Sequence, residues 1–187
     1  PSFTWNPNEQ TSLTFYGQYQ KDNDVPEAQG LPAYGTVFST PNGRIKRSTF
    51  IGEPGLNSYD RDQFVLGYEF SHEFNDVWTF KSITAYRTGD TDTLIDFDNT
   101  PAPTLDIPAV YGDHQFTQEL QALFSTDRIQ GVAGIFYLDG TASGAFDTIA
   151  QNFGIVIGTA GYVETTSVAL FTDVNLDLTD RLHLGLG

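Results

Sequence analysis

Positive charge is concentrated at one place in this sequence, where Arg44, Lys46 and Arg47 lie within four positions of one another. They are three of only nine basic residues, against 24 acidic ones. Tyr34 precedes this basic cluster and Tyr59 follows it. Guanidinium groups bind carboxylate or catecholate oxygens through paired hydrogen bonds, and aromatic rings stack on flat ligands. The cluster predicts a site for an anionic, aromatic ligand such as a ferric chelate, unless the cations pair with the chain's own acids.

The densest group of acidic side chains consists of Asp90, Asp92, Asp96, Asp98 and Asp106. Its spacing does not match a calcium-binding loop, because no glycine stands at the sixth position and no glutamate closes a twelve-residue frame. We therefore expect a solvated acidic loop. A divalent cation held within the loop or shared with lipopolysaccharide is the alternative.

No pattern typical of catalysis is present. His72, His114 and His183 lie on separate predicted strands, and none has a second histidine at the spacing of metal ligands. The absence of cysteine excludes disulfides and thiolate metal sites. We therefore predict no enzymatic activity and no cofactor.

The elements that would position these residues are strands, because apolar and polar residues alternate with a period of two. The clearest runs cover residues 12–21, 62–74, 116–125 and 167–178. Each run has a partner across a short turn, which gives about eight strands. No stretch shows helical spacing better than strand spacing. The predicted fold is all-β and antiparallel, with an up-and-down order.

The connections alternate between short and long. Short connections are predicted at residues 6–10, 75–77, 127–130 and 179–180, and long ones at 23–59, 93–112 and 144–162. All long connections therefore lie at one end of the sheet. Outer-membrane β-barrels have this arrangement, with short periplasmic turns and long extracellular loops.

Two further features favour a membrane barrel. The predicted arms are about 10–15 residues long, whereas a tilted strand needs about 9–11 residues to cross a bilayer. Trp5, Phe74, Trp78 and Phe124 all lie within a few residues of a short turn, as expected of an aromatic girdle at a membrane boundary. Aromatics covering one end of a β-sandwich core are the alternative explanation.

Composition excludes several classes of partner and fold. The formal charge of −15 argues against binding of nucleic acid, which requires a basic surface. The longest weakly polar run, residues 153–163, is far shorter than the roughly 20 apolar residues of a membrane helix. Both ends fall within alternating runs, so we expect this chain to be part of a longer protein.

Several segments resemble the barrel of TonB-dependent ferric siderophore receptors. They include Gly30-Leu-Pro-Ala-Tyr-Gly, Pro41-Asn-Gly-Arg-Ile-Lys-Arg, Leu66-Gly-Tyr-Glu-Phe-Ser-His, Phe116-Thr-Gln-Glu-Leu-Gln and Leu178-Thr-Asp-Arg-Leu-His-Leu-Gly. The resemblance extends over nearly the whole chain. It rests on strand and turn patterns, so it indicates the family rather than the ligand.

The resemblance implies a bacterial outer-membrane location and a barrel of about 22 strands with a plug inside it. Residues 1–187 would form part of that barrel, without the plug. The implied partners are a ferric siderophore, outer-membrane lipid and lipopolysaccharide, and TonB through parts of the parent protein outside this chain. A small eight-stranded barrel for anchoring or adhesion and a secreted carbohydrate-binding β-sandwich are the alternatives. A sandwich would bury its apolar faces against each other and dissolve without detergent.

Overall fold

The computed structural model describes residues 1–24, 58–97 and 104–187. Its strands are β1 (Ser2–Asn8), β2 (Thr11–Asp24), β3 (Ser58–Glu73), β4 (Trp78–Asp96), β5 (Asp106–Ser125), β6 (Ile129–Ala150), β7 (Ile155–Thr179) and β8 (Leu182–Leu186). One 3-10 helix, Gln151–Phe153, joins β6 to β7. Within the described ranges, no helix has the length and apolar character needed to cross a membrane.

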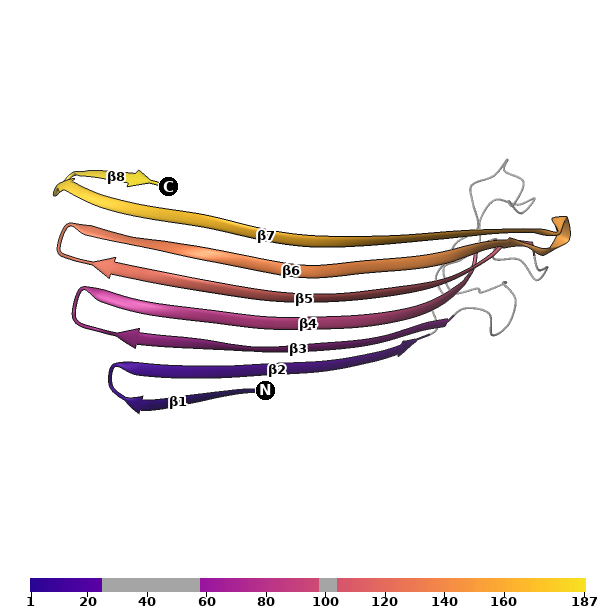
Figure 1. Cartoon of the computed structure of the whole chain (residues 1–187), viewed down its shortest axis with the longest axis horizontal. Helices are drawn as coiled ribbons and strands as arrows, with labels where there is room; N and C mark the ends of the chain where they lie inside the picture. Colours follow the sequence, from indigo (N-terminus) through magenta and orange to yellow (C-terminus); the bar gives the residue numbers. More distant parts are fainter. Residues whose placement is uncertain (25–57, 98–103) are drawn as a thin grey trace, which may run out of the picture.

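The eight strands form one antiparallel sheet in which each strand pairs with the next along the chain (Figure 1). β1 and β8 lie at the two edges of this open sheet. The prediction of an all-β, up-and-down arrangement of about eight strands is confirmed. The four short turns also lie at the predicted places, and all four are at the same end of the sheet (Figure 1).

Two of the predicted long connections are wrong. Residues 93–112 mostly belong to strands, because β4 continues to Asp96 and β5 begins at Asp106. Residues 144–162 are likewise paired along β6 and β7, apart from the helical turn between them. These strand ends are rich in Gly, Ala, Thr and Asp, and their apolar residues do not alternate with polar ones, as at Ile155, Val156 and Ile157. Backbone pairing continues there because ladder hydrogen bonds do not require an apolar face.

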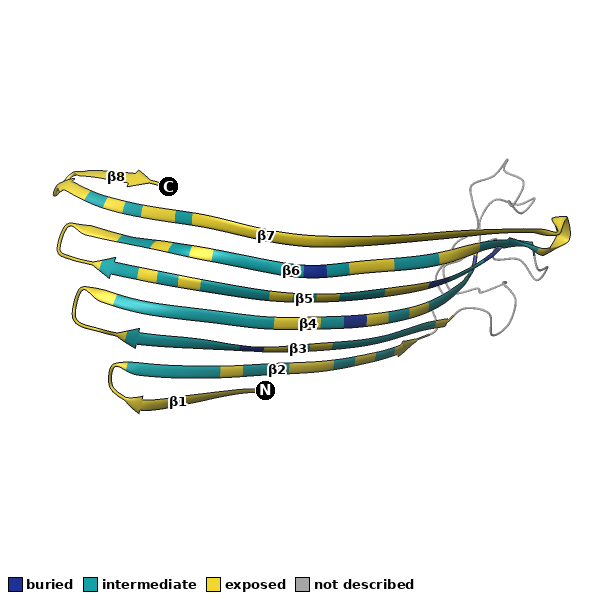
Figure 2. Cartoon of the chain, viewed as in Figure 1, coloured by how far each residue is buried: buried dark blue, intermediate teal, exposed yellow. Residues whose placement is uncertain are grey.

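The sheet has two faces of different chemistry, which we call the outer and inner faces. Odd-numbered residues of β2 and β6 and even-numbered residues of β3, β4, β5 and β7 share the outer face. The other parity forms the inner face. Large apolar side chains on the outer face stay uncovered, as at Leu170, which is 82% exposed, and Val168, which is 64% exposed. Exposed residues extend along most of β7 (Figure 2).

An uncharged band crosses the outer face. It comprises the outer-face residues of ranges 64–72, 78–88, 116–124, 129–137 and 166–178. We call the end of the sheet opposite the four short turns the loop end. Toward it, the next outer positions after the band carry acidic side chains, at Asp62, Asp90, Asp139 and Glu164. Most of these ranges match the roughly 9–11 residues with which a tilted strand crosses a bilayer. At the same height the inner face carries Glu69, Lys81 and Glu119. This distribution is the one expected of barrel strands whose outer face contacts hydrocarbon and whose inner face lines the barrel interior.

The strands are staggered relative to the turns. One row of register partners contains Thr11, His72, Phe80, Ala122, Ala133 and Thr172. Thr11 begins β2 directly after the first turn, whereas β7 continues past Thr172 to Thr179 before the last turn. A line drawn through the four short turns is therefore inclined to the rows of register partners. A sheet must have this shear in order to close into a barrel with tilted strands.

Aromatic side chains mark the turn end of the band. Trp78 and Phe124 are register partners on neighbouring strands, and their ring centroids lie 5.5 Å apart. Trp5 and Phe74 lie beside the first two turns and are more than half exposed. Exposed amphipathic rings at one height are typical of the interfacial girdle of a membrane barrel.

Candidate ligand-binding wall

Four of the five predicted site residues, Tyr34, Arg44, Lys46 and Arg47, lie outside the described residues. Tyr59, the fifth, is the second residue of β3, near the loop end of the sheet. It is half-buried and belongs to the inner face, paired with Asp24 on β2 and Thr93 on β4. The structure therefore places Tyr59 on the wall above the level of the band, facing the barrel interior.

Arg61 lies two residues after Tyr59 and shares its face, because side chains at i and i+2 project from the same side of a strand. Its Nη2 donates a hydrogen bond to the Gln63 Oε1 at 2.9 Å. Asp22, its register partner on β2, accepts hydrogen bonds from Gln20 instead. Among the described residues, no salt bridge joins Arg61 to a carboxylate.

Arg87 and Asp113 form an ion pair lower on the same wall. Arg87 donates from Nε and Nη2 to the Asp113 Oδ2, at 3.1 and 2.7 Å. Gly89 leaves room for this carboxylate, because a Cβ there would lie 3.2 Å from the Asp113 Oδ1. A hollow of about 230 Å³ extends from this pair toward β7 along Leu138 and Val163. The wall thus combines guanidinium and carboxylate groups with an adjoining apolar surface.

A second polar cluster lies on the inner face at the height of the band. Lys81 Nζ is 3.3 Å from the Glu69 Oε1, and Gln121 donates to the Glu119 Oε1 at 2.6 Å. Glu69 and Glu119 are both register partners of Ile83, one on each side. The cluster has two carboxylates and one ammonium group, so it presents surplus negative charge to the barrel interior.

The predicted acidic loop is only partly confirmed. Asp90 and Asp92 are exposed residues of β4 on the outer face, as expected of solvated carboxylates. Asp96 and Asp106 are instead buried register partners in β4 and β5, at 1% and 4% exposure. Asp98 falls outside the described residues. In the part of the chain that the structure describes, no three His, Asp or Glu side chains are grouped to hold a metal ion.

The outer face above the band carries a small hydrogen-bonded group. The Tyr19 hydroxyl donates to Asp62, and Lys21 Nζ lies 3.3 Å from the Asp62 Oδ2. The Tyr19 hydrogen bond, helped by Lys21, lowers the pKa of the Asp62 carboxyl. Lys21, a cation of the outer face, is therefore already neutralised by an acid of its own chain. This group faces away from the barrel interior.

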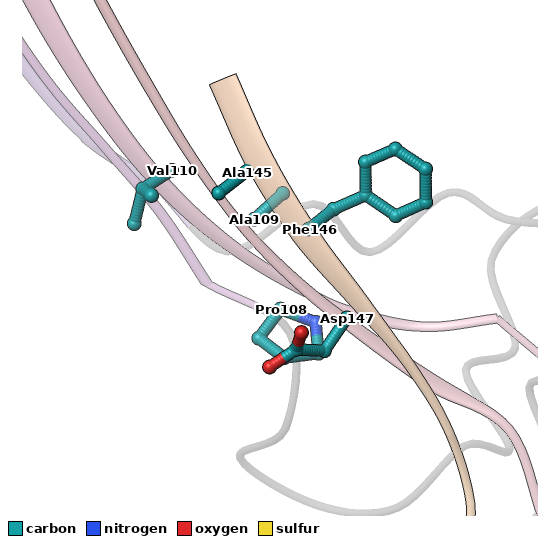
Figure 3. A pocket seen from close by; sticks show the side chains of 6 residues that line it. All are labelled: Pro108, Ala109, Val110, Ala145, Phe146 and Asp147. Carbon is teal, nitrogen blue, oxygen red and sulfur yellow. The ribbon is translucent and has the colours of Figure 1, made fainter. Parts of the chain in front are cut away.

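A small apolar hollow near the loop end does not add to the site. Figure 3 shows it between β5 and β6, where Asp147 lies beside Pro108 and Phe146 points to the other side of the ribbon. Its volume is about 150 Å³, and Asp147 is its one charged lining residue. It therefore lacks the convergent polar groups that would bind an oxygen-rich chelate.

The inner wall contains functional candidates that the sequence analysis did not select. Arg87 lay within a predicted strand and Arg61 directly before one, yet only the basic cluster of the first long connection was chosen as a site. The missed signal is the odd or even residue number, which decides the face of a strand. Arg61 and Tyr59 both have odd numbers, so the selection of Tyr59 should have extended to Arg61. Parity on β3 and β4 alone would have placed Tyr59, Arg61 and Arg87 on one face.

Comparisons with known proteins agree on one family. Residues 3–187 match the family model described as TonB dependent receptor-like, beta-barrel. The chain is 37% identical over 81 residues to the ferrichrome outer membrane transporter/phage receptor of Escherichia coli K12, which covers 43% of the chain and 11% of that protein. It is 36% identical over 91 residues to the ferrioxamine receptor of Yersinia enterocolitica, covering 49% and 12% respectively.

A solved structure shares the fold. The crystal structure of the ferric yersiniabactin uptake receptor from Yersinia pestis matches with a TM-score of 0.78 and 17% sequence identity. The match covers 98% of this chain and 27% of that receptor. The chain thus corresponds to about a quarter of a solved barrel protein, and its matches span about an eighth of the curated relatives' length.

Proposed function

This chain belongs to the TonB-dependent receptor family as part of the β-barrel, and from that premise we propose that its parent protein imports a ferric siderophore. Members of this family are transporters of the bacterial outer membrane and not enzymes. The named relatives are receptors or transporters for ferrichrome and ferrioxamine. The whole-length match to one family replaces the alternatives of a carbohydrate-binding sandwich and a small anchoring barrel.

The inner wall above the band would contribute to capture of the chelate. The observation that carries this proposal is Arg61, an inner-face cation that has an amide partner and no carboxylate partner among the described residues. A ferric siderophore presents oxygen atoms, which guanidinium groups bind well. Tyr59, two residues away on the same face, adds an aromatic surface and a hydroxyl group. Arg44, Lys46, Arg47 and Tyr34 remain a proposed second part of the site.

The parent would also contain a plug that fills the barrel and receives energy from TonB. The cluster of Glu69, Lys81 and Glu119 faces the interior at the height where such a plug would sit. Its surplus carboxylate favours a plug surface with basic side chains, because an unpaired charge in a confined site is costly. Outer-membrane lipid would contact the band, and lipopolysaccharide would surround the strand ends above it.

The test compares two cations on opposite faces of the wall in the full-length parent. Arg61→Gln should weaken binding of a ferric siderophore by about tenfold, because a charge-assisted hydrogen bond is lost. Lys21→Gln is the matched control, since Lys21 is on the outer face and already paired with Asp62. Binding would be measured on purified receptor by fluorescence quenching, and uptake with radioactive iron. Equal affinity of the parent and Arg61→Gln would remove this wall from the binding site.

The loop cluster has its own experiment. Replacing Arg44, Lys46 and Arg47 together with alanine should reduce affinity for an anionic ferric chelate more than for a neutral one, because charge attraction contributes only to the anionic case. The comparison is made with the two chelates in the same binding assay. An equal loss for both would indicate damage to the fold, and no loss would exclude the cluster.

A further inference from the structure

We propose that Ser82, Thr84 and Gln118 form a register lock that fixes the pairing of β4 with β5 inside the hydrocarbon layer. All three side chains belong to the outer face, in the central part of the uncharged band. A carboxamide in contact with lipid is unexpected, because hydrocarbon offers no hydrogen-bonding partner and polar side chains within membranes have specific roles. This inference concerns assembly of the barrel and does not depend on the identity of the ligand.

The three side chains satisfy one another. Thr84 Oγ1 donates to the Gln118 Oε1 at 2.5 Å, and Gln118 Nε2 donates to the Ser82 Oγ at 3.0 Å. Gln118 Nε2 also lies 3.3 Å from the carbonyl oxygens of Ile83 and Glu119. The carboxamide thus uses both its donor and acceptor groups within the sheet and requires nothing from lipid.

The geometry depends on the register of the two strands. Thr84 is paired with Gln118, and Ser82 is paired with Leu120. If β5 slipped by two residues so that Thr84 faced Leu120, Ser82 would face Ala122 and Gln118 would face Tyr86. Thr84 would then lie at the diagonal position that Ser82 holds in the native pairing, and the Gln118 Oε1 would lose its directly opposed hydroxyl donor in a medium that cannot replace it. Native pairing is therefore favoured over this alternative.

The alternation of polar and apolar residues does not by itself exclude a slip of two residues. A slip of one residue would move charged inner-face residues into lipid, so alternation alone prevents it. A slip of two preserves the alternation and exchanges one apolar neighbour for another. Polar contacts on the inner face, such as Arg87 with Asp113, are reached by water, which can satisfy displaced groups. The triad faces hydrocarbon, where water offers no substitute for its hydrogen bonds.

The test measures register directly by disulfide cross-linking in the full-length parent. The chain contains no cysteine, so introduced pairs can be read without background from this segment. Cysteines replacing Ala85 and Thr117 report native register, because these inner-face residues are partners. Cysteines replacing Ala85 and Glu119 report the slip that brings Thr84 opposite Leu120. Both pairs are placed in the natural sequence and in the triple variant Ser82→Ala, Thr84→Val, Gln118→Leu.

After refolding into detergent, the triple variant should give at least about tenfold more of the slipped cross-link than the natural sequence does. The variant is more apolar on a lipid-facing surface, so it should still insert and fold. Thr172→Val is the matched control, because Thr172 also places a hydroxyl in the band but donates to the Val132 carbonyl instead of a side chain. An unchanged slipped product in the triple variant, or an equal rise in the control, would overturn the lock.

Discussion

Individual glycines on this sheet differ in what surrounds them, and Gly67 is among the most constrained. It is buried on the inner face of β3, and its register partner is Tyr16. A Cβ at Gly67 would lie 2.4 Å from the Tyr16 ring and 2.8 Å from the Thr84 carbonyl oxygen. The tyrosine ring therefore covers the glycine, which is a known way to stabilise a glycine within a strand.

Gly67→Ala should destabilise the parent by about 1–3 kcal/mol, because overpacking forces both the ring and the backbone to move. Gly17→Ala is the control, since a Cβ there would lie 3.7 Å from its nearest neighbours, an ordinary contact. The measurement is the temperature at which the folded band disappears on unboiled gels. Equal temperatures for the two variants would mean that Tyr16 does not occupy this space in the membrane.

At the scale of the strand, alternation predicts which environment each side chain meets. Leu170 and Ala169 are neighbours on β7, but the first belongs to the outer face and the second to the inner face. Leu170→Arg should cost about 2–4 kcal/mol, the penalty for arginine near the midplane of a bilayer. Ala169→Arg should insert normally because its side chain faces the barrel interior.

The experiment on this pair is refolding of the parent into lipid vesicles, with the folded fraction measured along a urea series. Leu170→Arg should lower the midpoint, and Ala169→Arg should leave it close to that of the natural sequence. The two substitutions add the same charge at adjacent positions, so total charge cannot explain a difference. The reverse order would mean that the outer and inner faces have been assigned the wrong way round.

The sequence was sufficient for the parts of the strands that lie in hydrocarbon. There the outer face must be apolar, so Phe64, Leu66 and Phe70 alternate with polar residues and reveal both the strand and its lipid-facing side. Beyond the band both faces meet water, so residues 93–96 and 144–150 carry no such pattern although they are paired strands. The burial of Asp96 and Asp106 depends on tertiary surroundings, which local periodicity does not encode.

At the scale of the whole chain, the charges are distributed unequally between the faces. Above the band the outer face carries Asp60, Asp62, Asp90 and Asp92 with the cation Lys21. The inner face carries a more even mixture, with Arg61 and Arg87 beside Asp22, Asp24 and Asp113. The overall charge of −15 therefore does not describe the surface that a ligand inside the barrel would meet. A net negative protein can still bind an anion when the cations are gathered on the wall of a confined site.

The open sheet also predicts how residues 1–187 behave when produced alone. β1 and β8 occupy the sheet edges, and the outer face leaves large apolar side chains uncovered, such as Phe3 at 63% and Leu170 at 82% exposure. Unpaired edges bind other strands, and a continuous apolar surface associates in water. The isolated segment should therefore sediment from buffer and become dispersed only in detergent, as measured by centrifugation and light scattering. A segment that stays monomeric in buffer would mean that its outer face packs against protein instead of lipid.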